Sequence, residues 1–189
     1  MTTVGVLALQ GAFIEHEHKL QQLGAKTVEV RLPHHLTEID ALIIPGGEST
    51  TIGKLATSYG LIEPLKQFAQ TKPTWGTCAG MIFLASHLGQ HHQPILGVMD
   101  ITVNRNAFGR QIDSFETDLA INGLDEPFHA VFIRAPIATA VGEKVEVLAQ
   151  LSPTQIVIAR EGHLLASAFH PELTDDTRLH QYFLNMLSD

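Results

Sequence analysis

The strongest chemical signal in the sequence is Cys78, the single cysteine, which lies within Gly-Thr-Cys-Ala-Gly at residues 76–80. This is the Gly-x-nucleophile-x-Gly pattern of a nucleophile elbow, with sulfur in place of the serine oxygen. The flanking glycines permit a tight turn and a close approach of neighbouring backbone. A buried structural thiol is the alternative, because free cysteines are often fully buried. The glycine pattern favours a nucleophile that transfers an acyl group through a thioester.

A base for this thiol is predicted in Phe-His-Pro-Glu at residues 169–172. Pro171 disfavours the helical conformation at His170, so we expect an extended chain in which His170 and Glu172 point the same way. Glu172 would orient the imidazole, and His170 would exchange protons with Cys78, as in a nucleophile–base–acid triad.

The remaining histidines receive no role. Most of them lie in segments that read as helix or loop, where we expect them to be solvated. Adjacent histidines chelate metals poorly, and no thiol or carboxylate cluster accompanies them, so we assign neither a metal nor a cofactor. The histidines that we expect to be solvated are His16, His18, His34, His35, His91 and His92.

A glycine turn, Pro-Gly-Gly-Glu-Ser, occupies residues 45–49. The backbone N–H groups of Gly46 and Gly47, with that of Ala79 after the nucleophile, would form an oxyanion hole. A phosphate-binding loop is the competing interpretation. We reject it because the spacing from Gly47 to Gly53 is one residue too long and no hydroxyl follows Lys54.

These residues must be positioned by the elements that precede them. The apolar run at 4–9 and the segments 27–32, 41–44 and 74–77 read as strands, and helices are predicted at 14–23, from about 49 to 59, at 64–70 and at 79–88. This alternation predicts a parallel sheet with helices on both faces. Gln10, the glycine turn and Cys78 each follow a strand. We therefore expect them at the carboxyl edge of the sheet, where ligands bind.

The second half of the chain has a different pattern, with short strands and few helices between them. We predict several antiparallel pairs there. A C-terminal helix is predicted over 175–187, and we expect a single domain over residues 1–189. The predicted strands cover 95–103, 115–120, 129–134, 145–151, 155–160 and 164–169.

Composition sets the class of protein. The 189 residues are 44% hydrophobic and 17% charged, which indicates a globular chain. A net charge of −8 argues against nucleic-acid or anionic-membrane binding. A lone cysteine excludes an intrachain disulfide and fits the reducing cytoplasm. We expect no signal peptide at the N-terminus and no membrane-spanning segment.

Together, the cysteine, glycine-turn and His-Pro-Glu motifs resemble those of class I (triad) glutamine amidotransferases. More narrowly, the sequence resembles the PdxT/SNO family, the glutaminase subunits of pyridoxal 5′-phosphate synthase. The similarity spans nearly the whole chain and preserves the order of the motifs. The segments that carry it are 9–12, 45–51, 104–111, 113–116, 132–136 and 169–174; Asn-Arg-Asn-Ala-Phe-Gly-Arg at 104–110 and Phe-Ile-Arg-Ala-Pro at 132–136 are the discriminating ones.

The resemblance implies a three-layer α/β/α (flavodoxin-like) fold, a mostly parallel sheet with an antiparallel extension, and a triad of Cys78, His170 and Glu172. It also places Gln10 near the synthase contact and the oxyanion region. Arginine suits the glutamine α-carboxylate because its donor fork matches a carboxylate. Without the family, a surface salt bridge would be the preferred role for Arg105 and for Arg110. The glutamine site implied by the resemblance comprises Gly47, Glu48, Ser49, Arg105, Ile133 and Arg134.

The resemblance further implies hydrolysis of L-glutamine to glutamate and ammonia. The ammonia would pass to a (βα)8-barrel synthase, whose double-ring dodecamer carries glutaminase subunits, and a free subunit would be poorly active. We expect no fused synthetase domain after the C-terminal helix and therefore expect the ammonia acceptor on another polypeptide. The alternatives are a glutaminase or γ-glutamyl hydrolase of another pathway, a non-catalytic regulatory subunit, and a redox-sensing thiol protein.

Overall fold

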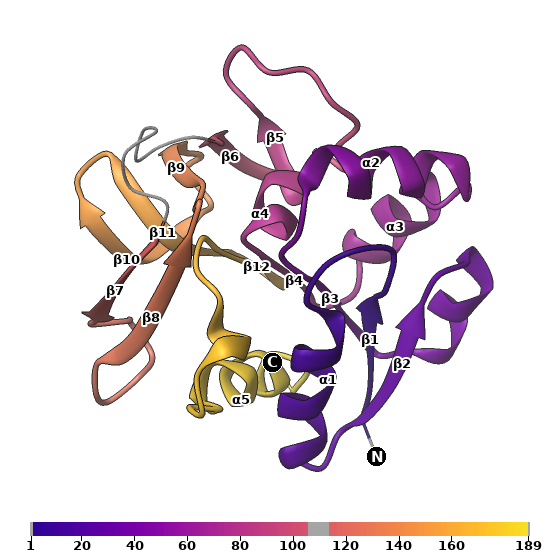
Figure 1. The fold of residues 1–189 in the computed structure, drawn as a ribbon, viewed down its shortest axis with the longest axis horizontal. Helices are drawn as coiled ribbons and strands as arrows, with labels where there is room; N and C mark the ends of the chain where they lie inside the picture. The colour runs from indigo at the N-terminus through magenta and orange to yellow at the C-terminus, as the bar shows by residue number, and fades with distance from the viewer. Residues whose placement is uncertain (1, 106–113, 189) are drawn as a thin grey trace.

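The structure is a computed structural model that describes residues 2–105 and 114–188 (Figure 1). Ten strands of these residues form one sheet, and two further strands, β7 (Ser114–Leu119) and β8 (Phe128–Ile133), form an antiparallel ribbon. The strands of the large sheet are β1 (Thr3–Leu7), β2 (Lys26–Val30), β3 (Ala41–Ile44), β4 (Thr74–Thr77), β5 (Ala85–His87), β6 (Met99–Asn104), β9 (Ile137–Val141), β10 (Glu146–Ser152), β11 (Gln155–Glu161) and β12 (Leu164–Ser167).

The first half of the sheet is parallel, as the sequence predicts. Strands run in the order β2-β1-β3-β4-β12, and each neighbouring pair is parallel. Every residue of β3 and β4 is buried. Continuous burial is expected of a parallel strand with helices on both faces, and it explains the unbroken apolar run at 41–44.

The other half is mostly antiparallel, which the short strands of the second half predict. The order continues from β12 through β11, β9 and β6, all antiparallel neighbours, while β10 pairs with β11. Two strands of this half, β5 and β9, were not predicted. The predicted helix over 79–88 is too long, because the chain leaves the helical conformation at Ala85, where ψ is 144°, and β5 pairs with β6 instead.

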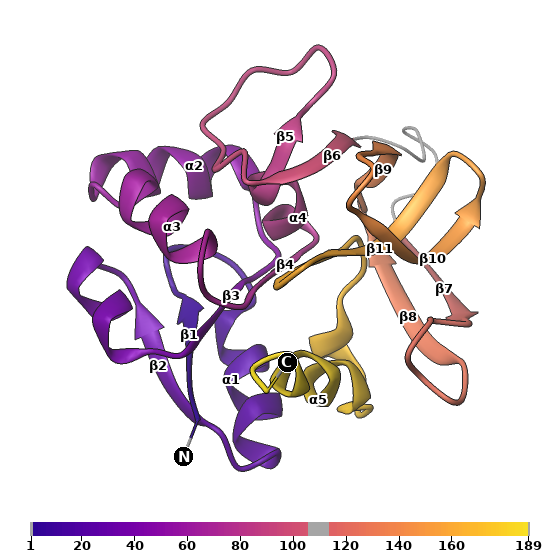
Figure 2. The ribbon, with the colours of Figure 1, turned by 180° about the vertical axis from the view of Figure 1, so that it is seen from behind.

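Helices cover both faces of the parallel strands. Helices α1 (Phe13–Gln22) and α5 (Arg178–Asn185) lie on one side. Helices α2 (Ser49–Ser58), α3 (Ile62–Ala69) and α4 (Ala79–Leu84) lie on the other, as Figures 1 and 2 show. Two 3-10 turns, η1 (Pro33–Glu38) and η2 (Pro171–Leu173), complete the described elements. The predicted three-layer α/β/α architecture is confirmed.

The core lies on both faces of this sheet. Trp75 and Phe183 pack together on the α5 side, with ring centroids 5.5 Å apart, and both are fully buried. No helix within the described residues is long and apolar enough to cross a membrane.

Candidate active site

Four segments meet at the carboxyl ends of neighbouring parallel strands. Gln10 follows β1, Gly46 follows β3, Cys78 follows β4 and His170 follows β12. The approach is close: a methyl group added to Gly46 would lie 2.6 Å from Cε1 of His170 and 3.3 Å from Cβ of Cys78. Only glycine leaves room for both side chains at this position, so the glycine turn and the two predicted reactive residues form one site.

Cys78 occupies a strained turn between β4 and α4. Its φ is 48° and its ψ is −104°, a left-handed conformation that side-chain-bearing residues rarely adopt and that persists where the surroundings enforce it. The surroundings do so here. The N–H of Cys78 donates to the Ser167 carbonyl at 2.8 Å, and a side chain on Gly80 would collide with the Ile44 carbonyl. The thiol is a free, buried cysteine, and its Sγ lies 3.9 Å from the Ile133 carbonyl oxygen.

His170 and Glu172 are paired, but not in the conformation predicted. His170 caps the 3-10 turn η2 with φ −107° and ψ 84°, and Glu172 lies inside that turn, so the extended chain expected here is wrong. The tight turn instead brings residue i+2 beside residue i. Nδ1 of His170 lies 2.7 Å from Oε1 of Glu172, and both side chains are buried. The N–H of His170 donates to the Val131 carbonyl at 2.8 Å, which fixes the start of the turn.

The pair carries opposite charges. Burial lowers the pKa of His170, but hydrogen bonds to Cys78 and Glu172 outweigh burial and raise this pKa to about 10. Burial raises the pKa of Glu172, but His16 and His170 beside it hold this pKa below its ordinary value. A buried carboxylate that faces an imidazolium is the arrangement that orients a base beside a nucleophile.

His16 lies behind this pair and is fully buried, so its predicted solvent exposure is wrong. It sits on the inner face of α1, one helical turn before the buried Leu20. Its Nδ1 lies 2.9 Å from Nε2 of His180 on α5, and its Nε2 lies 3.1 Å from Oγ1 of Thr77 and 3.5 Å from Oε2 of Glu172. The helical spacing from His16 to Leu20 is the sequence signal that could have placed it in the interior.

The glycine turn is held by the loop after β1. The carbonyl of Gly46 accepts a hydrogen bond from the N–H of Ala12 at 3.0 Å, and Oε1 of Gln10 accepts one from the N–H of Glu48 at 2.7 Å. The N–H of a trans peptide points opposite to its C=O, so the N–H of Gly47 is directed away from Ala12. Because its side chain accepts the hydrogen bond from Glu48, Gln10 contacts the turn directly.

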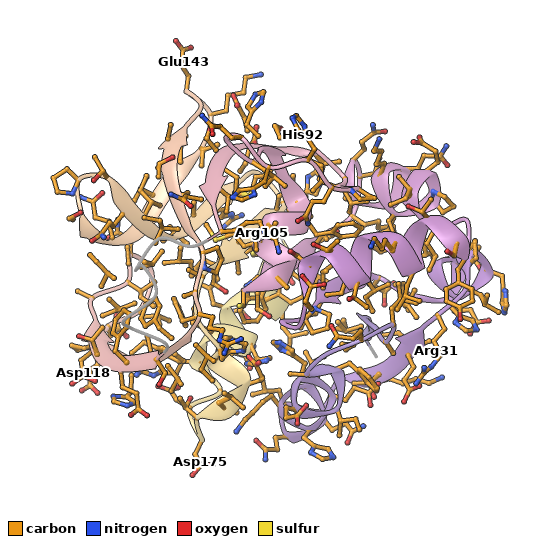
Figure 3. All side chains as sticks on the ribbon, turned by 45° about the horizontal axis from the view of Figure 1, so that its top comes forward. Arg31, His92, Arg105, Asp118, Glu143 and Asp175 are labelled. Atoms are coloured by element: carbon orange, nitrogen blue, oxygen red, sulfur yellow. The ribbon has the colours of Figure 1, made fainter. Side chains whose placement is uncertain are left out.

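Glu48 caps helix α2. Its carboxylate accepts from the N–H groups of Thr50 and Thr51 at 3.1 and 2.7 Å and also pairs with Arg105 at 3.2 Å. Burial raises the pKa of Glu48, but hydrogen bonds from the hydroxyl and N–H of Thr51 and from Thr50 outweigh it and lower this pKa. Figure 3 shows Arg105 near the centre of the view, beside the start of α2. Glu48 and Arg105, two of the predicted substrate-binding residues, therefore contact each other at the rim of the site.

The other predicted substrate-binding residues divide between rim and interior. Ser49 is buried, and its hydroxyl lies 3.3 Å from Oε1 of Gln93, a neighbour that no sequence motif indicated. Ile133 is 40% exposed, and Arg134 is exposed with a positive φ of 45°, at the end of β8. The discriminating segment 104–110 is described only for its first two residues; Arg110 and the stretch 106–113 lie outside the described residues.

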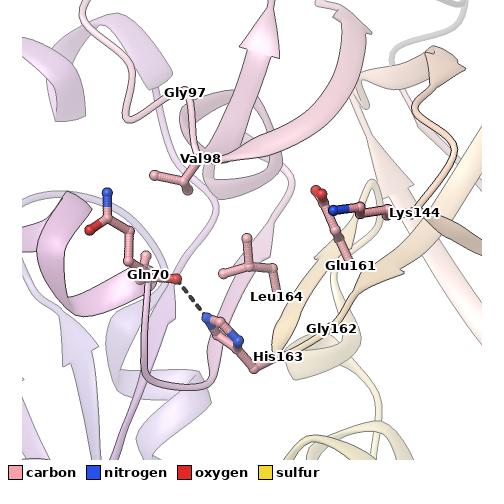
Figure 4. A pocket seen from close by; sticks show the side chains of 9 residues that line it. Gln70, Gly97, Val98, Lys144, Glu161, Gly162, His163 and Leu164 are labelled. Carbon is pink, nitrogen blue, oxygen red and sulfur yellow. Dashed lines mark hydrogen bonds between the residues drawn. The ribbon is translucent and has the colours of Figure 1, made fainter.

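A hollow lies at the opposite edge of the sheet (Figure 4). Its volume is about 630 Å³, and Gln70, His163 and Leu164 line it together with Lys144 and Glu161. Gln70 precedes β4 and His163 precedes β12, whereas the reactive residues follow those strands. Nε2 of His163 is hydrogen-bonded to the Ala69 carbonyl at 2.8 Å, so its side chain fixes the wall of the hollow. Among the described residues, no group of three metal-ligating side chains is placed to hold a metal ion.

The similarity to known proteins covers nearly the whole chain. Residues 6–189 match the SNO glutamine amidotransferase family. The pyridoxal 5′-phosphate synthase subunit PdxT of Herpetosiphon aurantiacus is 61% identical over 97% of this chain and 100% of its own length. The subunit of the same name from Roseiflexus sp. is 56% identical over 97% of this chain and 100% of its own.

Solved structures extend this similarity to the fold. A crystal structure described as a glutamine amidotransferase has a TM-score of 0.92 and 53% identity, and covers 98% of this chain and 99% of its own. The structure of PurLQS from Thermotoga maritima has a TM-score of 0.70 at 17% identity, over 98% of this chain and 99% of its own, and shares the fold alone.

Proposed function

The chain belongs to the SNO glutamine amidotransferase family, and from that premise we propose that it hydrolyses L-glutamine at Cys78 and supplies the ammonia to a pyridoxal 5′-phosphate synthase. The observation that carries the assignment of the reactive residues is the 2.7 Å contact between His170 and Glu172 beside a strained, buried cysteine. We take residues 1–189 to act as one glutaminase domain. We also take the cytoplasm as its location, because a thiol nucleophile must stay reduced.

The proposed reaction has two halves. The Cys78 sulfur attacks the side-chain amide carbon of glutamine, and His170 protonates the nitrogen as the C–N bond breaks and ammonia leaves. Water then attacks the γ-glutamyl thioester, and His170 accepts a proton from it. The C–S bond breaks, glutamate departs and the thiolate is restored. Glu172 holds the imidazole in place and stabilises its positive charge through both halves.

The tetrahedral oxyanion would be stabilised by backbone N–H groups. We assign this role to the turn at Gly46 and Gly47 together with Ala79, the first residue of α4. The hydrogen bond from Ala12 to the Gly46 carbonyl supports this assignment, because it directs the N–H of Gly47 away from the loop after β1.

The charged rim would bind the amino-acid end of glutamine. Glu48 suits the α-ammonium group, and Arg105 and Arg134 suit the α-carboxylate, since each pairs opposite charges through hydrogen bonds. Gly47, Ser49 and Ile133 would complete the walls. The pairing of Glu48 with Arg105 at 3.2 Å supports this role, because the two charges that the substrate must meet already lie together.

The partner is proposed from the family. Relatives bear the name of a synthase subunit, and we propose that this chain docks on a (βα)8-barrel synthase assembled as a double-ring dodecamer. Gln10 would contact that partner or respond to it. Its hydrogen bond to the N–H of Glu48 supports a link between docking and the oxyanion turn, so that the free subunit hydrolyses glutamine slowly.

The experiment is glutamate release with and without the synthase, together with glutamine-driven formation of pyridoxal 5′-phosphate. We expect Cys78→Ala to abolish both, and His92→Gln, a change at an exposed histidine, to leave both unchanged. Undiminished product from Cys78→Ala would indicate a non-catalytic regulatory subunit. Rapid hydrolysis of γ-glutamyl peptides in place of free glutamine would assign the chain to another pathway.

A further inference from the structure

A cluster of polar side chains is sealed behind the proposed triad. His16, Thr77 and His180 are fully buried, and Glu172 is nearly so. The cluster joins four separate elements: α1, β4, η2 and α5. Buried polar groups are costly unless they are paired, so a set of this kind implies a defined arrangement of protons.

One oxygen of Glu172 makes the arrangement specific. Its Oε1 is occupied by His170 at 2.7 Å. Its Oε2 is buried and has no hydrogen-bond partner among the described residues, and Nε2 of His16 lies 3.5 Å away. A buried carboxylate oxygen strongly favours a nearby N–H, because an unpaired buried acceptor has lost its hydrogen bonds to water without replacing them.

The positions of the protons follow from the two ends of the cluster. If Nε2 of His16 carries the proton, that N–H faces Glu172 and Thr77, and Nδ1 of His16 accepts from Nε2–H of His180. Nδ1 of His180, which has no partner among the described residues, is then a bare acceptor. In the opposite arrangement, a lone pair of His16 would face the carboxylate and a buried N–H of His180 would be unpaired, which is the more costly outcome.

We propose that His16 is a positioning residue of the triad: its Nε2–H is directed at Oε2 of Glu172, and His180 holds it in that tautomer. The proposal rests on the proposed roles of Cys78, His170 and Glu172. His16 does not touch substrate, and it acts by fixing the carboxylate that in turn fixes the base. Its place is on α1, the helix that begins just after the loop at Gln10.

The charges around the cluster set its pH response. His170 and His16 face Glu172, while Glu15 on α1 acts on His16 and Lys19 acts on His180. Burial lowers the pKa of His16, although Glu172 opposes this effect, so the ring is neutral and supplies an N–H without a charge. Removal of that N–H raises the pKa of the Glu172 carboxyl, which then takes up a proton at higher pH.

The first test compares His16→Met with His16→Gln in the complex with the synthase. The glutamine amide nitrogen reaches about as far as Nε2 and keeps a donor, whereas methionine fills the space without one. We expect His16→Met to lower kcat/KM by about 10- to 100-fold and to move the acid limb of its pH profile to higher pH. His16→Gln keeps the position of the limb and most of the activity.

Two outcomes overturn the proposal: an unshifted acid limb in His16→Met, and equal losses at every pH in both variants, which would indicate a role in packing alone. The Cys78→Ala variant is measured alongside. If Cys78→Ala is active, the proposed triad itself is wrong. If Cys78→Ala is inactive and His16→Met is unaffected, only the role proposed for His16 is wrong.

A second test needs no variant to fold. With 15N-labelled histidine, NMR of the intact 20.7 kDa chain reports which ring nitrogen carries the proton. We expect Nε2–H tautomers for both His16 and His180 at pH 7. An Nδ1–H tautomer at His16 would overturn the proposal whatever the activity of the variants.

Discussion

Nδ1 of His170 lies 2.7 Å from Oε1 of Glu172, although His170 caps a 3-10 turn that contains Glu172 and neither residue lies in a strand. The turn lets residue i+2 fold back on residue i, and Pro171 at its first position pre-sets the backbone. Two residues separated by one position would therefore supply the proposed base and its orienting acid. The pair needs only the third residue, Cys78, from another strand.

Loss of the base is expected to remove catalysis without removing binding. His170→Gln should lower kcat for glutamine hydrolysis by about 100-fold to 10,000-fold, because the step that protonates the leaving nitrogen loses its donor. KM should change little, since the rim that faces the amino-acid end is untouched. Steady-state glutamate release in the presence of the synthase measures both constants. A kcat within a few-fold of the wild-type value would contradict the assignment of His170.

The Glu172 carboxylate is expected to stabilise the fold in a pH-dependent way. Its pKa is lowered from the ordinary value of 4.5, so its contribution is complete above pH 4.5 and is lost as pH falls through the lowered value. Urea unfolding between pH 5 and 6 should show Glu172→Gln to be less stable than the wild type, and the difference should shrink as the pH falls below 4.5. A difference independent of pH would exclude a charge contribution.

His180 is expected to make the fold sensitive to acid. Burial lowers its pKa from 6.5 to about 2, with smaller contributions from His16 and Lys19, so between these values the unfolded chain binds a proton that the folded chain does not. Stability should then fall with decreasing pH by up to about 1.4 kcal/mol per pH unit. His180→Gln should flatten this slope. The matched control is His92→Gln, at an exposed site, which should leave the slope unchanged.

Glu48 is expected to have two separable roles. As the cap of α2 it should contribute about 1 kcal/mol, so Glu48→Ala should lower the free energy of unfolding by that amount. Glu48→Asp keeps a carboxylate at the cap but shortens its reach to Arg105. We expect Glu48→Asp to retain most of the stability and to raise KM for glutamine, as measured by urea unfolding and by glutamate release. A KM unchanged in both variants would remove Glu48 from the substrate site.

Parts of the fold could be predicted because the local sequence pattern of a segment agrees with the element that its packing in the sheet requires. The strand at 41–44 is an apolar run that ends at Pro45, and the strand at 74–77 ends at Cys78 of the elbow motif; their bounds are those of β3 and β4. Strand β9 escaped prediction because Ile-Ala-Thr-Ala-Val alternates weakly and pairs only with distant strands. The helix after Cys78 was overextended because nothing in its sequence shows that β6 competes for the chain at Ala85.

The site shows the same division. Cys78, His170 and the glycine turn could be found because each lies in a short motif directly after a strand. His16 and His180 could not be found in this way. A histidine within a polar helix resembles a solvated residue unless its spacing from the buried apolar residues of that helix is considered. Gln93 carried no signal, since its contact with Ser49 depends on the course of a loop and not on a pattern.

The pairing of β4 with β12 has a consequence for the newly made chain. Cys78 follows β4, while His170 follows β12, the last strand in chain order among the described residues. A nascent chain that already carries the thiol has neither the imidazole nor the carboxylate to activate it. In the proposed mechanism, Cys78 is therefore activated only when the segment after β12 closes onto the sheet, and a chain truncated before that segment carries a dormant cysteine.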